Sequence, residues 1–332
     1  MQRGSIRSLP IDSAMLRDNP LGDPHQRTLP VYLPPGYDAD RSRHYPVVFV
    51  LAGYTSTGPS LLNWRGWQES SPERLDRLIT GGDIPPMIAA FPDCWTRWGG
   101  SQYLDSPATG RYMSHVVDEL VLAVDATLRT VPEPSSRAVT GLSSGGYGSL
   151  MLAMERPGTF GLVAATAADC AFELSYRPDL PKFVATVEAA GGLEPFLEGF
   201  FEAKRLRSDQ VTAMMTIAMS ACYSPSPGRP PIDADLPVDL YTAELLPDVW
   251  DRWLARDPVH LVPARTAELS DLRLLFLDAG RRDEYNLQFG HRIVARELDR
   301  AGVRYVFEEF DGGHRGVGYR QEAALRRIGS AL

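Results

Sequence analysis

Apolar residues recur along this chain in two alternating patterns. Short continuous apolar runs, typical of strands buried on both faces of a parallel sheet, alternate with stretches in which apolar residues keep helical spacing. The predicted strands span residues 29–33, 45–51, 87–91, 138–140, 162–165, 272–277 and 303–307, the first of them at a sheet edge. The predicted helices span residues 111–130, 144–156, 287–298 and 321–328. This alternation predicts an α/β fold, with a mostly parallel sheet flanked by helices on both faces.

One region interrupts the alternation. About a hundred residues separate the strand at 162–165 from the strand at 272–277, and a structureless connection of that length is unusual in a compact domain. The region contains helix-like stretches at residues 182–190, 194–206 and 209–221 and a Pro-rich loop at 224–231. We therefore expect a helical cap at residues 173–268, inserted between two parts of one core, 1–172 and 269–332.

Composition narrows the class of protein. Hydrophobic residues make up 44% and charged residues 23% of the chain, as in ordinary globular proteins, and the net charge of −8 argues against a nucleic-acid partner. No apolar run reaches the roughly 18 residues that a bilayer span requires. The first ten residues lack the apolar core of a secretory signal, which favours a cytoplasmic location unless a signal has been removed. The oligomeric state stays open, and a homodimer is one alternative.

The most informative motif is Gly141-Leu142-Ser143-Ser144-Gly145, a G-x-S-x-G between a predicted strand and a predicted helix. A serine on such a turn is lifted out of the sheet beside the unpaired N–H groups that begin the helix. Ser143 is therefore the candidate nucleophile. The alternative interpretation is a Gly-rich strand-to-helix turn with a buried serine.

The base should follow the nucleophile late in the chain, because enzymes with this turn carry their triad in the order Ser, acid, His. Two histidines lie beyond the cap region, His291 and His314. His291 falls in a predicted helix, where a structural or surface role is favoured. His314 follows Gly312-Gly313 in a loop directly after the strand at 303–307, and it is the candidate general base.

Three acidic residues near the end of the strand at 272–277 compete for the role of the acid. Asp278 ends that strand, whereas Asp283 lies further into the following loop and is free to reach Nδ1 of His314. Asp283 is favoured over Asp278, and Glu284 is the third candidate.

Two backbone amides are candidates for an oxyanion hole. The first is the N–H of Ser144, directly after the nucleophile, and the second is the N–H of Tyr54, in the loop after the strand at 45–51. Gly53 would let this loop turn so that the Tyr54 amide points at the substrate oxygen. The alternative for this loop is an ordinary Gly-containing connection.

Four tryptophans follow the two strands whose carboxyl ends should face the site. Ligands bind at this edge in sheets of this type, so an aromatic wall would suit an aryl or otherwise bulky apolar ester. The alternative is that these side chains anchor long loops on the core. The four residues are Trp64, Trp67, Trp95 and Trp98.

Taken together, these segments resemble the putative-esterase branch of the α/β-hydrolases, which includes enterochelin esterase-like proteins, esterase D or S-formylglutathione hydrolase, feruloyl esterases and the antigen 85 mycolyltransferases. The likeness runs through 31–37, 51–54, 141–148, 280–283 and 312–314, and it covers most of the chain except the cap. The resemblance implies an α/β-hydrolase fold, the triad Ser143, Asp283 and His314, and the Tyr54 and Ser144 amides as the oxyanion hole.

The chain departs from this family in three places. Ala52-Gly53 stands where the family usually has His-Gly, which removes a supporting side chain and leaves the backbone role intact. The stretch 99–106 lacks the segment associated with S-formylglutathione hydrolases, which disfavours that substrate. The cap is longer than in the compact members.

These observations predict a serine carboxylic-ester hydrolase that acts on a small-molecule ester through an acyl-enzyme. We expect no metal and no organic cofactor, because the mechanism needs none and the sequence has no His/Glu zinc signature. Two alternatives remain: an acyltransferase with the same triad, and a catalytically silent ligand-binding protein on the same fold. The identity of the ester is left open among aryl, feruloyl-type, siderophore and polyester substrates.

Overall fold

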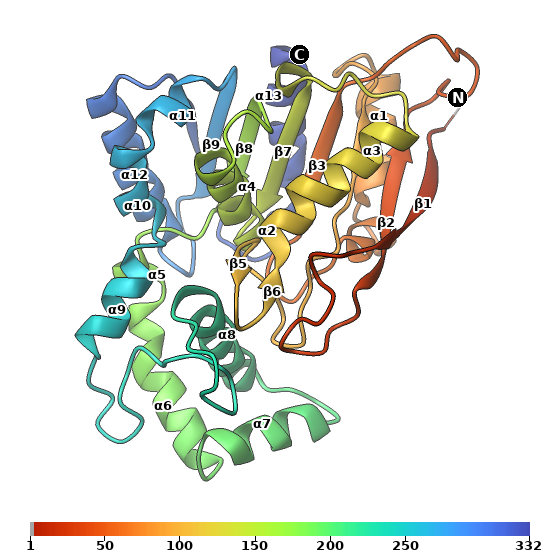
Figure 1. Cartoon of the computed structure of the whole chain (residues 1–332). Helices are drawn as coiled ribbons and strands as arrows, with labels where there is room; N and C mark the ends of the chain where they lie inside the picture. Colours follow the sequence, from red (N-terminus) through yellow and green to blue (C-terminus); the bar gives the residue numbers. More distant parts are fainter. Residues whose placement is uncertain (1–2) are drawn as a thin grey trace.

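The computed structural model describes residues 3–332, and its centre is a sheet of eight strands (Figure 1). The strand order is β1-β2-β4-β3-β7-β8-β9-β10. β1 and β2 are antiparallel to their neighbours, and all other neighbours run parallel. The strands are β1 (Ser5–Asp12), β2 (Gln26–Leu33), β3 (Val47–Leu51), β4 (Ile88–Ala90), β7 (Arg137–Leu142), β8 (Leu162–Thr166), β9 (Leu274–Gly280) and β10 (Val306–Phe310). The predicted mostly parallel α/β sheet is confirmed.

Helices cover both faces of this sheet. The core helices are α1 (Ser71–Thr80), α2 (Tyr112–Ser114), a π-helical segment (His115–Leu120), α3 (Val121–Thr127), α4 (Ser144–Glu155), α12 (Leu287–Ala301) and α13 (Gln321–Ala331). A two-stranded ribbon, β5 (Asp105–Ser106) and β6 (Gly110–Arg111), precedes α2. Short 3₁₀ turns occupy Pro59–Leu62, Pro134–Ser136, Arg177–Asp179, Val262–Ala264 and Val317–Arg320.

The continuous apolar runs of the sequence are explained by burial on both faces. In β3, Val48 and Val50 pack in the cluster formed with α1 and α13, whereas Val47, Phe49 and Leu51 pack in the cluster on the opposite face. Successive side chains of a strand point to opposite faces, so a strand with helices on both sides needs apolar residues at every position. Each such side chain contributes roughly 1.5–3 kcal/mol by its burial.

Two predicted strand positions were wrong. The segment 29–33 was expected at the sheet edge, but β1 pairs with β2 and forms the edge instead. β1 escaped notice because most of its side chains are exposed and polar, without an apolar run. The strand predicted at 303–307 begins three residues later as β10, because α12 continues to Ala301 and ends at Gly302, whose φ of 67° stops the helix.

Seven α-helices of the described chain lie between β8 and β9. They are α5 (Phe172–Ser175), α6 (Leu180–Ala189), α7 (Leu193–Glu202), α8 (Ser208–Tyr223), α9 (Pro247–Leu254), α10 (Pro258–Leu261) and α11 (Thr266–Ser270). Figure 1 shows α6, α7, α8 and α9 gathered at one end of the sheet. The division at residues 173–268 remains a prediction.

An aromatic cluster joins the inserted helices α5, α8 and α9 to the core. Tyr223 of α8 has its ring centroid 5.0 Å from Phe172, 5.2 Å from Trp253 and 5.8 Å from Tyr147 of the core helix α4. Aromatic pairs in this range contribute about 0.5–1.5 kcal/mol beyond their burial. The cluster therefore packs the inserted helices against the helix that begins after Ser143.

Candidate active site

Ser143 lies on the turn between β7 and α4 and has an uncommon backbone conformation, with φ 58° and ψ −123°. The glycines on either side, Gly141 and Gly145, do not have positive φ angles themselves, and they have a different role. A Cβ on Gly141 would lie 2.3 Å from the carbonyl carbon of Gly145, and a Cβ on Gly145 would lie 2.3 Å from the Leu51 oxygen. The glycines provide room for backbone segments in contact, while Ser143 itself carries the strained torsion angle.

His314 and Asp283 are in contact. Nδ1 of His314 lies 2.9 Å from Oδ2 of Asp283, whose side chain is fully buried and also accepts a 2.9 Å hydrogen bond from the Tyr285 amide. The backbone N–H of His314 donates to Oε2 of Glu284, which holds the loop rather than the imidazole. Asp278 lies elsewhere, since its Oδ2 accepts a 2.7 Å hydrogen bond from Arg320. Of the three candidate acids, the structure brings Asp283 to the histidine.

The surroundings of His314 favour its protonated form. Burial lowers the pKa of the imidazole, but the hydrogen bond and negative charge of Asp283, together with the charges of Asp169 and Glu284, outweigh burial and raise the pKa above its ordinary value of 6.5. A histidine held in this way is a stronger base in its neutral form. His291 is buried instead, with its ring stacked on Phe307 at 6.1 Å, and burial lowers its pKa to about 4. This burial excludes a surface position, and a structural role for His291 stays a prediction.

The hydroxyl of Ser143 does not donate to His314 in this structure. Ser143 Oγ lies 3.4 Å from Oδ1 of Asp169, and within residues 3–332 it makes no hydrogen bond to the imidazole. Ser143 and His314 nevertheless line the same cavity, which has a volume of about 720 Å³. The serine is therefore turned toward a second carboxylate at the site.

Sequence reasoning missed Asp169. Its Oδ2 accepts hydrogen bonds from Tyr176 OH at 2.8 Å, Ser144 Oγ at 3.1 Å and Gln102 Nε2 at 3.1 Å. Burial raises the pKa of this carboxyl, although the hydrogen bonds of Tyr176, Gln102 and Ser144 and the charge of His314 oppose that effect. One signal was present in the sequence: Asp169 is a single charged residue in an apolar stretch directly after β8, at the carboxyl end of the strand beside β7.

The two candidate oxyanion donors lie next to the nucleophile turn. A Cβ on Gly53 would be 3.1 Å from the Leu142 oxygen and 3.6 Å from Cβ of Ser143, so the loop carrying Tyr54 runs against that turn. The Tyr54 amide has no hydrogen-bond acceptor within residues 3–332, and its ring is fixed by a 2.8 Å hydrogen bond from OH to the Trp98 oxygen. Ser144 opens α4, where the first N–H groups have no partner inside the helix.

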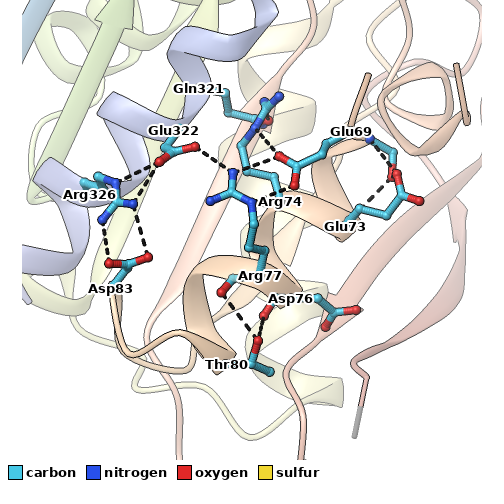
Figure 2. A network of polar contacts seen from close by, with 11 residues as sticks. Glu69, Glu73, Arg74, Asp76, Arg77, Thr80, Asp83, Gln321, Glu322 and Arg326 are labelled. Atoms are coloured by element: carbon cyan, nitrogen blue, oxygen red, sulfur yellow. Dashed lines mark hydrogen bonds and ion pairs between the residues drawn. The ribbon is translucent and has the colours of Figure 1, made fainter. Parts of the chain in front are cut away.

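Polar groups close the far wall of the cavity. Arg74 of α1 is buried and donates 2.8 Å hydrogen bonds to the Gly318 oxygen and to Oε1 of Gln321, at the start of α13. Figure 2 shows the surrounding network, in which Arg77 bonds both Glu69 and Glu322 at 2.6 Å. These contacts join α1 to the segment that follows His314, and they hold the histidine loop against the core.

The four candidate tryptophans do not gather around Ser143. Trp67 lines the cavity and is fully exposed, whereas Trp64, Trp95 and Trp98 do not line it. Trp98 is buried, with its ring 5.9 Å from that of Phe201 in α7, as expected for a side chain that anchors a loop. An aromatic wall built from all four residues is therefore wrong, because the loops after β3 and β4 direct these rings to different places.

No group of three or more His, Cys, Asp or Glu side chains within residues 3–332 is arranged to hold a metal ion. No helix in the same range is long and apolar enough to cross a membrane.

Comparison with known proteins adds the family context. A family model described as “Putative esterase” matches residues 24–324. S-formylglutathione hydrolase of Mus musculus is 28% identical over 149 residues, which cover 42% of this chain and 51% of that protein. A protein of Xylanibacter ruminicola named endo-1,4-beta-xylanase/feruloyl esterase is 27% identical over 143 residues, 41% of this chain and 18% of that protein. The chain thus spans about half the length of the mouse relative, and less of the second.

Solved structures share the whole architecture. A ferulic acid esterase superposes over 100% of both chains with a TM-score of 0.64 at 19% sequence identity. At this identity the likeness shows the fold, and it confirms the expected α/β-hydrolase architecture.

Proposed function

Since the chain belongs to the putative esterase family, we propose that it is a serine carboxylic-ester hydrolase with Ser143 as nucleophile, His314 as general base and Asp283 as the group that orients the imidazole. The observation that carries the proposal is the 2.9 Å contact between Asp283 and His314 at the cavity that Ser143 also lines. The substrate is a small-molecule ester. We propose residues 173–268 as a helical cap, which contacts the site through the 2.8 Å hydrogen bond from Tyr176 OH to Asp169.

The reaction begins with a rotation of the Ser143 side chain. Its Oγ–H leaves Asp169 and turns to Nε2 of His314, which takes the proton while Oγ bonds to the ester carbonyl carbon. The carbonyl oxygen becomes negative and accepts hydrogen bonds from the Tyr54 and Ser144 amides, each worth around 3 kcal/mol of transition-state stabilisation. The imidazolium then protonates the departing alkoxide, and an acyl-Ser143 ester remains.

Water completes the cycle. The neutral His314 takes a proton from water, whose oxygen attacks the acyl carbon, and the same proton returns to Ser143 as the acid is released. Throughout, the negative charge of Asp283 holds the Nδ1–H tautomer and stabilises the imidazolium.

A panel of p-nitrophenyl esters of increasing acyl length tests the proposal. The protein should release p-nitrophenol with saturation kinetics, and Ser143→Ala should lower kcat by several orders of magnitude with little change in thermal stability, because it removes one partly exposed oxygen. Ester turnover near the wild-type rate in a folded Ser143→Ala protein would overturn the mechanism.

A further inference from the structure

Asp169 is a carboxylate in direct contact with the nucleophile, and the hydrolytic mechanism does not use it. Negative charge beside a developing oxyanion opposes the reaction of a simple ester. The protein nevertheless holds Asp169 firmly between two residues with strained backbones, Ala167 with φ 44° and Ala171 with φ 53°. The amide of Ala171 is fixed in turn by a 2.9 Å hydrogen bond to the buried Asp257. Strain maintained by surrounding structure is characteristic of functional sites.

The two oxygens of Asp169 are in different situations. Oδ2 accepts from Tyr176, Ser144 and Gln102, and these bonds do not depend on the reaction. Oδ1 has one hydrogen-bond donor within residues 3–332, the hydroxyl of Ser143. When Ser143 turns to His314 and becomes acylated, Oδ1 loses that donor. A buried carboxylate oxygen without a partner is unfavourable, so the acyl-enzyme needs a replacement.

We infer that Asp169 selects esters whose acyl group carries a hydrogen-bond donor, a hydroxyl or an ammonium, on the carbon next to the carbonyl. This inference rests on the proposed function. Oδ1 lies 3.4 Å from Ser143 Oγ, and Oγ becomes bonded to the acyl carbonyl carbon. The turn of Ser143 toward His314 is a rotation about Cα–Cβ that leaves Cβ in place, so the acyl group stays beside Asp169. A donor on the carbon next to the carbonyl then occupies the place that the serine hydroxyl leaves. Asp169 is nearly buried, with 7% exposure, and it meets the cavity through Ser143, whose hydroxyl contacts Oδ1 and which itself lines the cavity.

The substitution Asp169→Asn tests whether Oδ1 acts as a hydrogen-bond acceptor for the substrate, because asparagine has nearly the same shape as aspartate. Three donors surround Oδ2, so the amide oxygen of the asparagine takes that position and the NH₂ group takes the position of Oδ1. The group facing the substrate then changes from acceptor to donor. Tyr176→Phe is the matched control, because it removes one bond to Oδ2 and leaves Oδ1 unchanged.

The experiment compares methyl lactate, alanine methyl ester and methyl propionate by pH-stat, with each kcat/KM divided by the rate constant for hydroxide hydrolysis of the same ester. In the wild-type protein, the normalised kcat/KM for methyl lactate should exceed that for methyl propionate by roughly 10- to 100-fold. Tyr176→Phe should retain this ratio. Asp169→Asn should reduce the ratio to less than about 3. If only methyl lactate is hydrolysed faster than methyl propionate, the contact to Asp169 is a hydrogen bond from a neutral hydroxyl. If alanine methyl ester is hydrolysed faster still, the contact is an ion pair between its ammonium group and Asp169.

Two results would overturn the inference: a wild-type ratio near one, or a ratio that Asp169→Asn leaves unchanged. If Asp169→Asn does not fold, the ratio of the lactate and propionate kcat/KM values in the wild-type protein still tests the inference. Hydrolysis of all three esters without discrimination counts against the role of Asp169 alone. Absence of hydrolysis of these esters and of p-nitrophenyl acetate counts against the proposed function as well.

Discussion

Oδ2 of Asp283 lies 2.9 Å from Nδ1 of His314, although the two residues belong to separate loops. The loops follow β9 and β10, which are neighbouring parallel strands with Phe310 paired to Gly280 at their carboxyl ends. Because parallel strands end at the same edge of the sheet, the loops after them meet there. Backbone hydrogen bonds hold the two loops together. The amides of Arg281 and Arg282 donate 2.9 Å hydrogen bonds to the oxygens of Phe310 and Gly312, respectively.

The first prediction concerns the acid. Asp283→Asn should preserve packing but favour the wrong imidazole tautomer, and kcat should fall roughly 10⁴-fold, as for the same exchange in the serine-protease template. Asp278→Asn is the control, because Asp278 is equally buried but pairs with Arg320. Its activity loss should be smaller and should follow its loss of stability. Steady-state kinetics and thermal melts of both variants distinguish Asp283 from Asp278 as the acid. If Asp278→Asn loses more kcat than Asp283→Asn at an unchanged Tm, the assignment of Asp283 is wrong.

The second prediction concerns pH. His314 acts as a base when neutral, so kcat/KM should rise with pH and level off above the pKa of the free enzyme, which lies above 6.5. In Asp283→Asn the raising effect of Asp283 is lost while burial still lowers the pKa, so the midpoint should move to lower pH. Profiles of kcat/KM for both proteins test this. An unchanged or higher midpoint in the variant would show that Asp283 does not set the basicity of His314.

The third prediction concerns the nucleophile turn. Gly145→Ala would place a Cβ 2.3 Å from the Leu51 oxygen, so the turn must shift, and we expect both a loss of stability of about 1–3 kcal/mol and a large loss of kcat. Gly199→Ala is the control, since Gly199 lies within α7 with nothing within 4 Å of its added Cβ. It should be neutral or stabilising by up to about 1 kcal/mol. Equal behaviour of the two variants in urea unfolding would contradict the close-approach argument.

The parts of this site that sequence could predict are those fixed by position in the fold. Ser143 and His314 stand beside glycines at the ends of predicted strands, and the parallel topology brings such ends together. Asp169 could not be assigned in this way. Its role depends on side chains as distant in sequence as Gln102, 67 residues away, and on the direction in which Ser143 points. Neither follows from an apolar pattern.

The positions of the tryptophan side chains in long loops could not be predicted from the sequence either. Trp67 and Trp98 both follow sheet strands, yet one is fully exposed at the cavity and the other is buried against α7. A buried strand has its side-chain directions fixed by the pleat, whereas a long loop has no such period. The edge strand β1 was missed for a related reason, because its exposed polar residues leave no apolar signal.

An activated nucleophile at Ser143 should react covalently with an electrophilic probe, and the site of labelling can be measured by mass spectrometry. The native protein is treated with a fluorophosphonate probe and its mass is measured intact and after peptide mapping, alongside Ser143→Ala and Asp283→Asn. We predict one adduct per chain, located on Ser143, absent from Ser143→Ala and formed much more slowly in Asp283→Asn. No adduct on folded wild-type protein, or an adduct that persists in Ser143→Ala, would contradict it.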